Sequence, residues 1–165
     1  MKRRTILLGG GLVAILAATT ALSRMGASMD ASAEPFEVTK TEPEWRAILS
    51  PVQFAVLREE DTERPGSSPL NEEKRRGVFH CAGCDLPAYA SETKYESGTG
   101  WPSFWESLPD AVGTREDNSL FAMRTEVHCR RCGGHFGHIF DDGPHPTGKR
   151  HCLNGLALTF RPASA

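Results

Sequence analysis

The sequence lacks the excess of basic residues that a nucleic-acid-binding surface requires. Its 165 residues include 19 Lys and Arg against 21 Asp and Glu, a formal charge of −2 at pH 7, which disfavours that class of function. We find no internal repeat beyond two short cysteine motifs, and no cysteine near the N-terminal segment, which disfavours a lipoprotein. Cysteine itself is scarce, with five in the chain. Most of our interpretation depends on how these five are arranged.

Residues 1–33 are typical of an export signal. Lys2, Arg3 and Arg4 precede an apolar run of 17 residues at 6–22, and Ala-Ser-Ala at 31–33 suits a signal peptidase. The adjacent arginines and the glycines within the run resemble a twin-arginine signal, so we expect export to the periplasm. The alternative is an uncleaved membrane anchor, because this run approaches the length of the shortest spanning helices.

Cleavage after residue 33 leaves 132 residues, enough for one domain with one core. Without the four basic residues and one acidic residue of the signal, 15 Lys and Arg face 20 Asp and Glu, a formal charge of −5. We divide this part into a tether at 34–40, a folded domain at 41–161 and a short tail at 162–165. We expect a monomer that does not bind nucleic acid.

Two helices are predicted at the start of the domain. Thr41 with Glu44, and Ser50 with Gln53, each match the capping box that begins a helix. Pro51 stands at the first position of the second helix, where proline is favoured. We expect both helices to serve as scaffold.

Short extended runs follow a loop at 64–69. Runs at 78–80, 120–127 and 153–161 are separated by Gly, Pro and Asp, as in antiparallel sheets. If the last run is one strand, its period of two places one set of residues on one face, and this set is Cys152, Asn154, Leu156, Leu158 and Phe160. We predict a mainly β fold: a small antiparallel, sandwich-like "β-tent" domain with N-terminal helices and a structural zinc site.

Four of the five cysteines form two C-x-x-C motifs, which are typical of a closed zinc site. Cys81 and Cys84 make the first motif, and Cys129 and Cys132 make the second. Four thiolates satisfy tetrahedral zinc and leave no open position, so we predict one structural Zn²⁺ and no organic cofactor. Disulfides, favoured by an oxidising compartment, and a redox dithiol are the alternatives.

The fifth cysteine, Cys152, is the candidate nucleophile. A reactive cysteine needs its thiolate form, which nearby cations such as Arg150 favour. Two histidines, His135 and His138, lie in the segment HFGHIFDDG at 135–143, and histidine is the usual side chain for proton transfer near neutral pH. A buried structural cysteine and satisfied core histidines are the alternatives. We interpret the combination as a catalytic site.

The segment GTGWPSFW at 98–105 supplies an apolar wall. We interpret Trp101 and Phe104 as substrate-binding residues that hold a small apolar group, with core packing as the alternative, above all for Phe104 and Trp105.

The segments GWPSF, HxGHxFxDG, the two C-x-x-C motifs and RxCxN occur in one order that resembles the B-type methionine sulfoxide reductases. The resemblance covers nearly all of residues 41–161 and implies thiol-dependent reduction of methionine (R)-sulfoxide, mainly within proteins. It implies that Cys152 attacks the sulfoxide sulfur and becomes a sulfenic acid. It further implies that Trp101 holds the substrate methyl group and that His138, helped by His135, protonates the departing oxygen. Three further residues match positions that shape the site: Asp142, Arg150 and Asn154.

Three residues depart from the pattern of that family. Thr99 stands where many members have a resolving cysteine, so we expect an external thiol, thioredoxin-like or other, to reduce the sulfenic acid. His151 replaces an aromatic residue, and Gly155 replaces serine. The main rival hypothesis is a non-catalytic, zinc-stabilised binding module on the same fold. A zinc ribbon for nucleic acid and a C-x-x-C dithiol oxidoreductase are weaker alternatives.

Overall fold

The structure is a computed structural model that describes residues 36–118 and 123–164. The predicted export signal and the first residues of the tether lie outside these ranges. In the part described, no helix is both long and apolar enough to cross a membrane. The helices and strands in chain order are α1 (Glu42–Ile48), α2 (Pro51–Glu59), η1 (Pro69–Glu72), β1 (Gly77–Cys81), β2 (Pro87–Ala90), η2 (Ser91–Thr93), β3 (Lys94–Tyr95), β4 (Ser103–Phe104), β5 (Val112–Asp117), β6 (Arg124–Cys129), β7 (His135–Phe140), β8 (Arg150–Leu153), η3 (Gly155–Ala157) and β9 (Leu158–Pro162).

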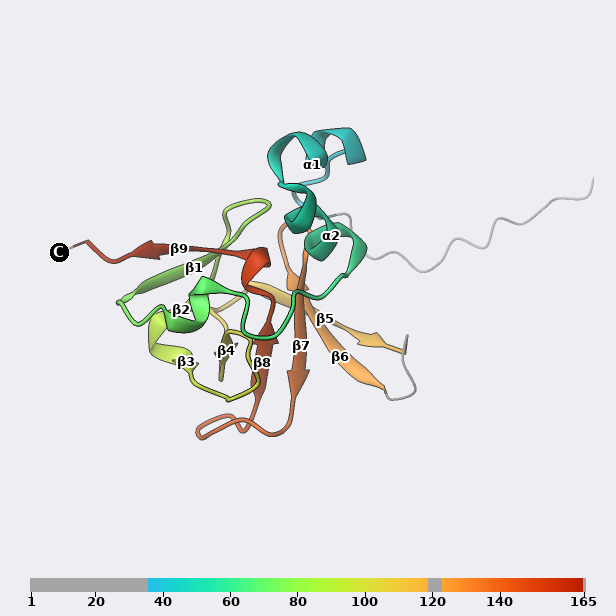
Figure 1. Ribbon diagram of the computed structural model, residues 1–165. Coiled ribbons are helices and arrows are strands. Elements are labelled where there is room, and N and C mark those ends of the chain that lie inside the picture. The colour runs from blue at the N-terminus through green and yellow to red at the C-terminus, as the bar shows by residue number, and fades with distance from the viewer. Residues whose placement is uncertain (1–35, 119–122, 165) are drawn as a thin grey trace, which may run out of the picture. The chain divides into compact units, whose positions relative to one another are not determined.

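Both predicted helices are present and begin at their predicted caps. The Glu44 carboxylate accepts the backbone N–H of Thr41 at 2.7 Å. At the second helix, Ser50 and Gln53 exchange bonds: the Gln53 side chain accepts the N–H of Ser50 at 3.1 Å, and the Ser50 hydroxyl accepts the N–H of Gln53 at 3.3 Å. These bonds satisfy N–H groups that the first helical turn leaves unpaired. Figure 1 shows α1 and α2 next to each other, with α2 against β7 and η3.

The strands form two antiparallel sheets, which confirms the predicted fold class. A three-stranded sheet has the order β2-β1-β9, and a six-stranded sheet has the order β3-β4-β8-β7-β6-β5 (Figure 1). The buried faces share one core of aromatic and aliphatic side chains. At its centre Phe79 of β1, Tyr89 of β2 and Phe104 of β4 are fully buried. Their ring centroids lie 4.7–5.0 Å apart along the series, within the usual range for aromatic pairs.

The six-stranded sheet brings chemically active residues of distant segments into one cross-strand row. In the register of the sheet, Arg115 lies opposite Glu126, Glu126 opposite His138, His138 opposite Cys152, and Cys152 opposite Ser103. Directly opposed residues in a sheet project from the same face. The pairing of the five strands β5, β6, β7, β8 and β4 therefore brings these residues together.

The prediction of one continuous strand at 153–161 is wrong. Strand β8 ends at Leu153, the helix η3 intervenes, and β9 joins the other sheet. The cause is a set of long-range hydrogen bonds: the N–H of Asn154 donates to the carbonyl of Phe136, and the N–H groups of Gly155 and Leu156 donate to the carboxylate of Glu63. Cys152 therefore does not share a strand face with Leu158 and Phe160. Of the run predicted at 120–127, the residues before 123 lie outside the description, and β6 begins at Arg124.

Candidate active site and metal centre

The four C-x-x-C cysteines meet at one point, which we call the four-cysteine centre, although they come from two separate hairpins. Cys81 ends β1 and Cys129 ends β6, and each begins a turn that carries the second cysteine of its pair. Both turns close in the same way: the N–H of Asp85 donates to the carbonyl of Cys81, and the N–H of Gly133 donates to that of Cys129. Asp85 and Gly133 adopt positive φ values of 62° and 68°, the backbone that such tight turns need.

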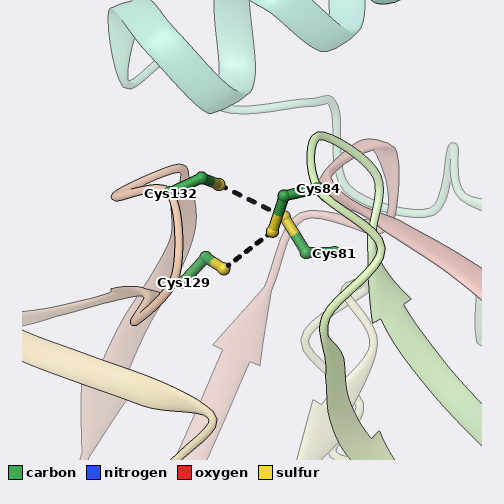
Figure 2. Close-up of side chains that lie close together, drawn as sticks. All are labelled: Cys81, Cys84, Cys129 and Cys132. Carbon is green, nitrogen blue, oxygen red and sulfur yellow. Dashed lines mark hydrogen bonds between the residues drawn. The ribbon is translucent and has the colours of Figure 1, made fainter. Parts of the chain in front are cut away.

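The arrangement of these sulfur atoms fits a tetrahedral metal ion. Figure 2 shows the four side chains pointing toward one another. The Sγ–Sγ distance is 3.7 Å between Cys81 and Cys132 and 3.5 Å between Cys84 and Cys129. All four sulfurs lie within 4.8 Å of one another. Sulfurs bound to zinc at about 2.3 Å stand about 3.8 Å apart in a tetrahedron. Hydrogen bonds with neighbouring thiols, first that of Cys129, raise the pKa of Cys81 and lower that of Cys84. A cation would take the place of these shared protons.

The fifth cysteine lies in a separate pocket on the six-stranded sheet. This pocket has a volume of about 150 Å³, and its wall includes Trp101, Arg124, His138, Phe140, Cys152 and Asn154. Close packing of β7 on β8 shapes its floor, because a Cβ on Gly137 would stand 2.1 Å from the carbonyl oxygen of Cys152. Cys152 is partly exposed and makes no disulfide, so its thiol is accessible from the pocket.

A chain of hydroxyl groups ends at the thiol of Cys152. The Ser103 hydroxyl donates to the carbonyl of Trp101 at 3.1 Å, the oxygens of Ser103 and Ser97 lie 2.8 Å apart, and those of Ser97 and Thr99 also lie 2.8 Å apart. Thr99 Oγ1 is 3.8 Å from Cys152 Sγ. A carbonyl only accepts and each hydroxyl has one hydrogen to donate. Because Ser103 donates its hydrogen to the Trp101 carbonyl, Ser97 donates to Ser103 and Thr99 donates to Ser97. Thr99 therefore accepts the thiol hydrogen of Cys152.

His138 stands opposite Cys152 in the sheet and bonds to a carboxylate from β5. Its Nε2 lies 2.7 Å from Oδ2 of Asp117, and the same oxygen accepts a bond from Arg124 at 2.6 Å. Burial lowers the pKa of His138, the bond to Asp117 opposes this effect, and the charges of Arg124 and His135 add to it. The result is a pKa below the ordinary value, which makes His138 a proton donor when it is charged.

His135 lies behind His138 and is held by a second buried carboxylate. The ring centroids of the two histidines are 5.5 Å apart. Nδ1 of His135 lies 2.7 Å from Oε1 of Glu126, whose side chain is 3% exposed and also pairs with Arg115. Burial raises the pKa of Glu126, but the bond from His135 and the charge of Arg115 outweigh it and lower the pKa overall. An ionised Glu126 places the hydrogen of His135 on Nδ1.

Arg150 and Asp142 form a bidentate ion pair, with both N–O distances at 2.8 Å. Arg150 also stacks on the ring of Phe140, 4.4 Å from its centroid. The Arg150 guanidinium lowers the pKa of Asp142, and the bond to Asp142 raises that of Arg150. Arg150 lies two residues before Cys152 and contributes positive charge near its sulfur, as a thiolate requires.

Glu63 joins the apolar wall of the pocket to the strand that carries Cys152. Its backbone carbonyl accepts the indole N–H of Trp101 at 3.0 Å, and its N–H donates to the side chain of Asn154 at 3.0 Å. Its carboxylate accepts the N–H groups of Gly155 and Leu156. Burial raises the pKa of Glu63, and these two bonds act against the increase. Trp101 and Asn154 are thus positioned by one residue of the loop after α2.

Two residues do not lie where a role in the pocket would place them. The sequence predicts a substrate contact for Phe104, but this residue is fully buried between Phe79 and Tyr89, so we assign it to the core. His151 alternates with Cys152 along β8 and faces the core as well, where its Nδ1 lies 3.0 Å from the hydroxyl of Tyr89. Burial, followed by the charge of Lys149, lowers the pKa of His151 to about 4.

Comparison with known proteins settles which family this site belongs to. Residues 49–162 match the family model described as the SelR domain. A peptide methionine sulfoxide reductase MsrB from Methanosarcina barkeri is 51% identical over 125 residues, which cover 75% of this chain and 88% of the relative. The chain belongs to the MsrB family. Similar relatives include MsrB from Pseudomonas putida, 49% identical over 76% of this chain and 96% of the relative, and peptide methionine sulfoxide reductase B5 from Arabidopsis thaliana, 45% identical over 81% and 96%.

Membership of the MsrB family confirms the predicted resemblance and makes the chain an oxidoreductase. Several residues of this MsrB site were not foreseen in the sequence. Glu63, Asp117, Arg124 and Glu126 all bond to predicted site residues or line the pocket. For Arg124 and Glu126 the only local signal is a charged residue in the strand segment RTEV at 124–127. Glu63 and Asp117 stand in the polar segments DTER at 61–64 and TRED at 114–117, which give no such signal. Thr62 also lines the pocket, and we see no signal that identifies it.

Proposed function

We propose that this MsrB-family enzyme reduces methionine (R)-sulfoxide, mainly in proteins, to methionine. The observation that carries the proposal is the placement of Cys152: it is the cysteine outside the four-cysteine centre, and it faces His138 across β7 and β8 in a pocket walled by Trp101. The names of the relatives, peptide methionine sulfoxide reductases, support this substrate class.

In the proposed reaction the Cys152 thiolate attacks the sulfoxide sulfur while His138 protonates the oxygen. The attack forms a bond between Sγ of Cys152 and the substrate sulfur. The protonated oxygen then passes to Sγ as the S–O bond of the substrate and the new S–S bond break, which releases methionine and leaves Cys152–SOH, so that cysteine is oxidised by two electrons and the sulfoxide is reduced by two. Trp101 borders the place of the substrate methyl group, and Arg150, paired with Asp142, favours the thiolate.

An external thiol completes the cycle in this proposal. Thr99, whose hydroxyl oxygen lies 3.8 Å from the sulfur, has no thiol, and the other four cysteines lie together in the four-cysteine centre. Two molecules of thiol reduce Cys152–SOH to Cys152–SH, releasing one disulfide and water. Trapping with dimedone after one turnover should label Cys152, whereas a disulfide within the chain would contradict this step.

We further propose that the four-cysteine centre holds one structural Zn²⁺ and that residues 1–33 direct the protein to the periplasm. Four sulfurs leave zinc without an open position, so the ion would stabilise the domain and take no part in the reaction. Metal analysis of the purified protein should give one zinc per chain. Expression of the full chain with a protease-accessibility assay would test the export signal.

The decisive experiment is an epimer-resolved assay with dithiothreitol as reductant and a peptide containing R or S sulfoxide as substrate. We expect turnover of the R epimer alone. Cys152→Ser should reduce activity to background and keep both zinc content and the circular dichroism spectrum, because Cys152 lines the pocket and lies outside the four-cysteine centre. Full activity of Cys152→Ser would remove the proposal, and an inactive wild-type protein with intact zinc would favour the binding module.

A further inference from the structure

The hairpin of β5 and β6 brings an ion pair to the ring of His138. Asp117 is the last residue of β5, Arg124 is the first residue of β6, and the two are directly opposed in the sheet. Asp117 Oδ2 lies 2.7 Å from Nε2 of His138 and 2.6 Å from the guanidinium of Arg124. The three side chains are only 14–28% exposed. Short bonds among partly buried charged groups are stronger than those on an open surface.

We propose that Asp117, held by Arg124, is a positioning residue that fixes a hydrogen on Nε2 of His138 and favours its charged form. This inference rests on the proposed function, in which His138 gives a proton to the departing oxygen. A carboxylate has no hydrogen to donate, so the hydrogen in the 2.7 Å contact belongs to the imidazole. The second ring nitrogen, Nδ1, is then the atom that gains or loses a proton.

The surroundings of His138 make Asp117 the principal group that favours its charge. Burial lowers the pKa of His138, and so do the positive charges of Arg124 and His135, whereas Asp117 raises it. Arg124 therefore acts in two ways: it holds Asp117 in place and it moderates the effect of the carboxylate. The ionisable groups that face the ring from the strands around it are Asp117 of β5, Arg124 and Glu126 of β6, His135 of β7, and Cys152 of β8.

These opposed charges give the two variants opposite effects. In Asp117→Asn the shape of the side chain is kept and its negative charge is lost, so we expect His138 to bind a proton about tenfold more weakly. In Arg124→Gln a positive charge is lost, so His138 should bind its proton more tightly. A change of packing alone would not move the two titrations in opposite directions.

The experiment is an NMR titration of the Cε1–H signal of His138 in the zinc-loaded protein, assigned with His138→Asn. Asp141→Asn is the matched control, because Asp141 is three residues from His138, 84% exposed, and pairs with Lys149. We expect the control to titrate as the wild type does. The inference is overturned if Asp117→Asn titrates like Asp141→Asn.

This titration needs no turnover, so it separates the inference from the proposed function. If the wild type reduces sulfoxide but Asp117→Asn and Asp141→Asn titrate alike, only the role of Asp117 is overturned. If the expected opposite shifts occur, the role of Asp117 in holding the proton is supported. In an active enzyme, the alkaline limb of the kcat profile should then move to lower pH in Asp117→Asn by the same amount as the titration.

Discussion

The chain keeps its five cysteines in two environments that differ in how they are built. The four-cysteine centre is made from two tight turns, and each turn supplies the two ligands of one C-x-x-C motif. The pocket around Cys152 is made from strands β4 to β8 and from the loops at 60–68 and 97–101. One site depends on local turn geometry and the other on sheet register.

This difference separates stability from reactivity. The four-cysteine centre joins the end of β1, in the three-stranded sheet, to the end of β6, in the six-stranded sheet. A metal ion bound there would link segments far apart in sequence and would therefore stabilise the fold. The pocket contains carboxylates, cations and hydroxyls arranged around one partly exposed sulfur, and their arrangement governs chemistry. Substitutions in the four-cysteine centre should therefore mainly change stability, and substitutions in the pocket should mainly change the reactivity of Cys152.

The largest effect is expected from breaking the four-cysteine centre. Cys129→Ser removes a buried thiol of the proposed zinc site and should lower the free energy of unfolding by at least about 3 kcal/mol, because metal binding and folding are coupled. Thermal unfolding followed by circular dichroism, with and without EDTA, measures the change. Cys152→Ser is the matched loss of a cysteine and should unfold like the wild type. Equal midpoints for the two variants would show that the four-cysteine centre does not support the fold.

The same distinction explains what could be predicted from the sequence. The four-cysteine centre was predictable because C-x-x-C spacing by itself places two sulfurs on one turn, and two such turns satisfy one ion. Motif residues such as Trp101, His138 and Cys152 were found from their order along the chain. The partners Asp117, Glu126 and Glu63 were not, because each reaches its histidine or indole only after the sheet has formed. The alternation of side chains along 153–161 also gave a wrong prediction of one strand. The carboxylate of Glu63, which lies 92 residues before Gly155, binds the N–H of Gly155 and redirects the backbone there.

A second prediction concerns His151, which is adjacent to the nucleophile but belongs to the core. Its pKa of about 4 in the folded protein lies below the value of 6.5 taken for the unfolded chain. A histidine of this kind stabilises the fold above pH 6.5, and its contribution is lost as the pH falls toward 4. Between pH 7 and pH 4 the loss amounts to about 3 kcal/mol.

Replacing His151 tests this assignment. His151→Phe cannot titrate, so its free energy of unfolding should fall less between pH 7 and pH 4 than that of the wild type. At pH 7 the variant should be less stable by about 1 kcal/mol, because the Tyr89 hydroxyl loses its partner. Urea unfolding at both pH values, with His145→Phe as a control, measures the difference. Equal pH dependence in His151→Phe and wild type would contradict the buried, neutral state.

The smallest effect is expected at Thr99, where reactivity should change and stability should not. In the resting protein the hydroxyl series accepts the hydrogen of Cys152, and once the thiol ionises the Thr99 hydroxyl can turn to donate to the sulfur. Only the carbonyl of Trp101 then loses a donor. Hydrogen bonds to an anion are the stronger kind, so Thr99→Val should slow alkylation of Cys152 by iodoacetamide at pH 7 about fivefold, the equivalent of one bond of about 1 kcal/mol.

Thr99→Ser should restore the rate. The control Thr159→Val, which changes an exposed threonine of β9, should not alter it. Mass spectrometry of the zinc-loaded protein follows the reaction at this one cysteine. A rate that is the same in Thr99→Val and Thr159→Val would mean that the hydroxyl series fills space beside the sulfur without acting on it.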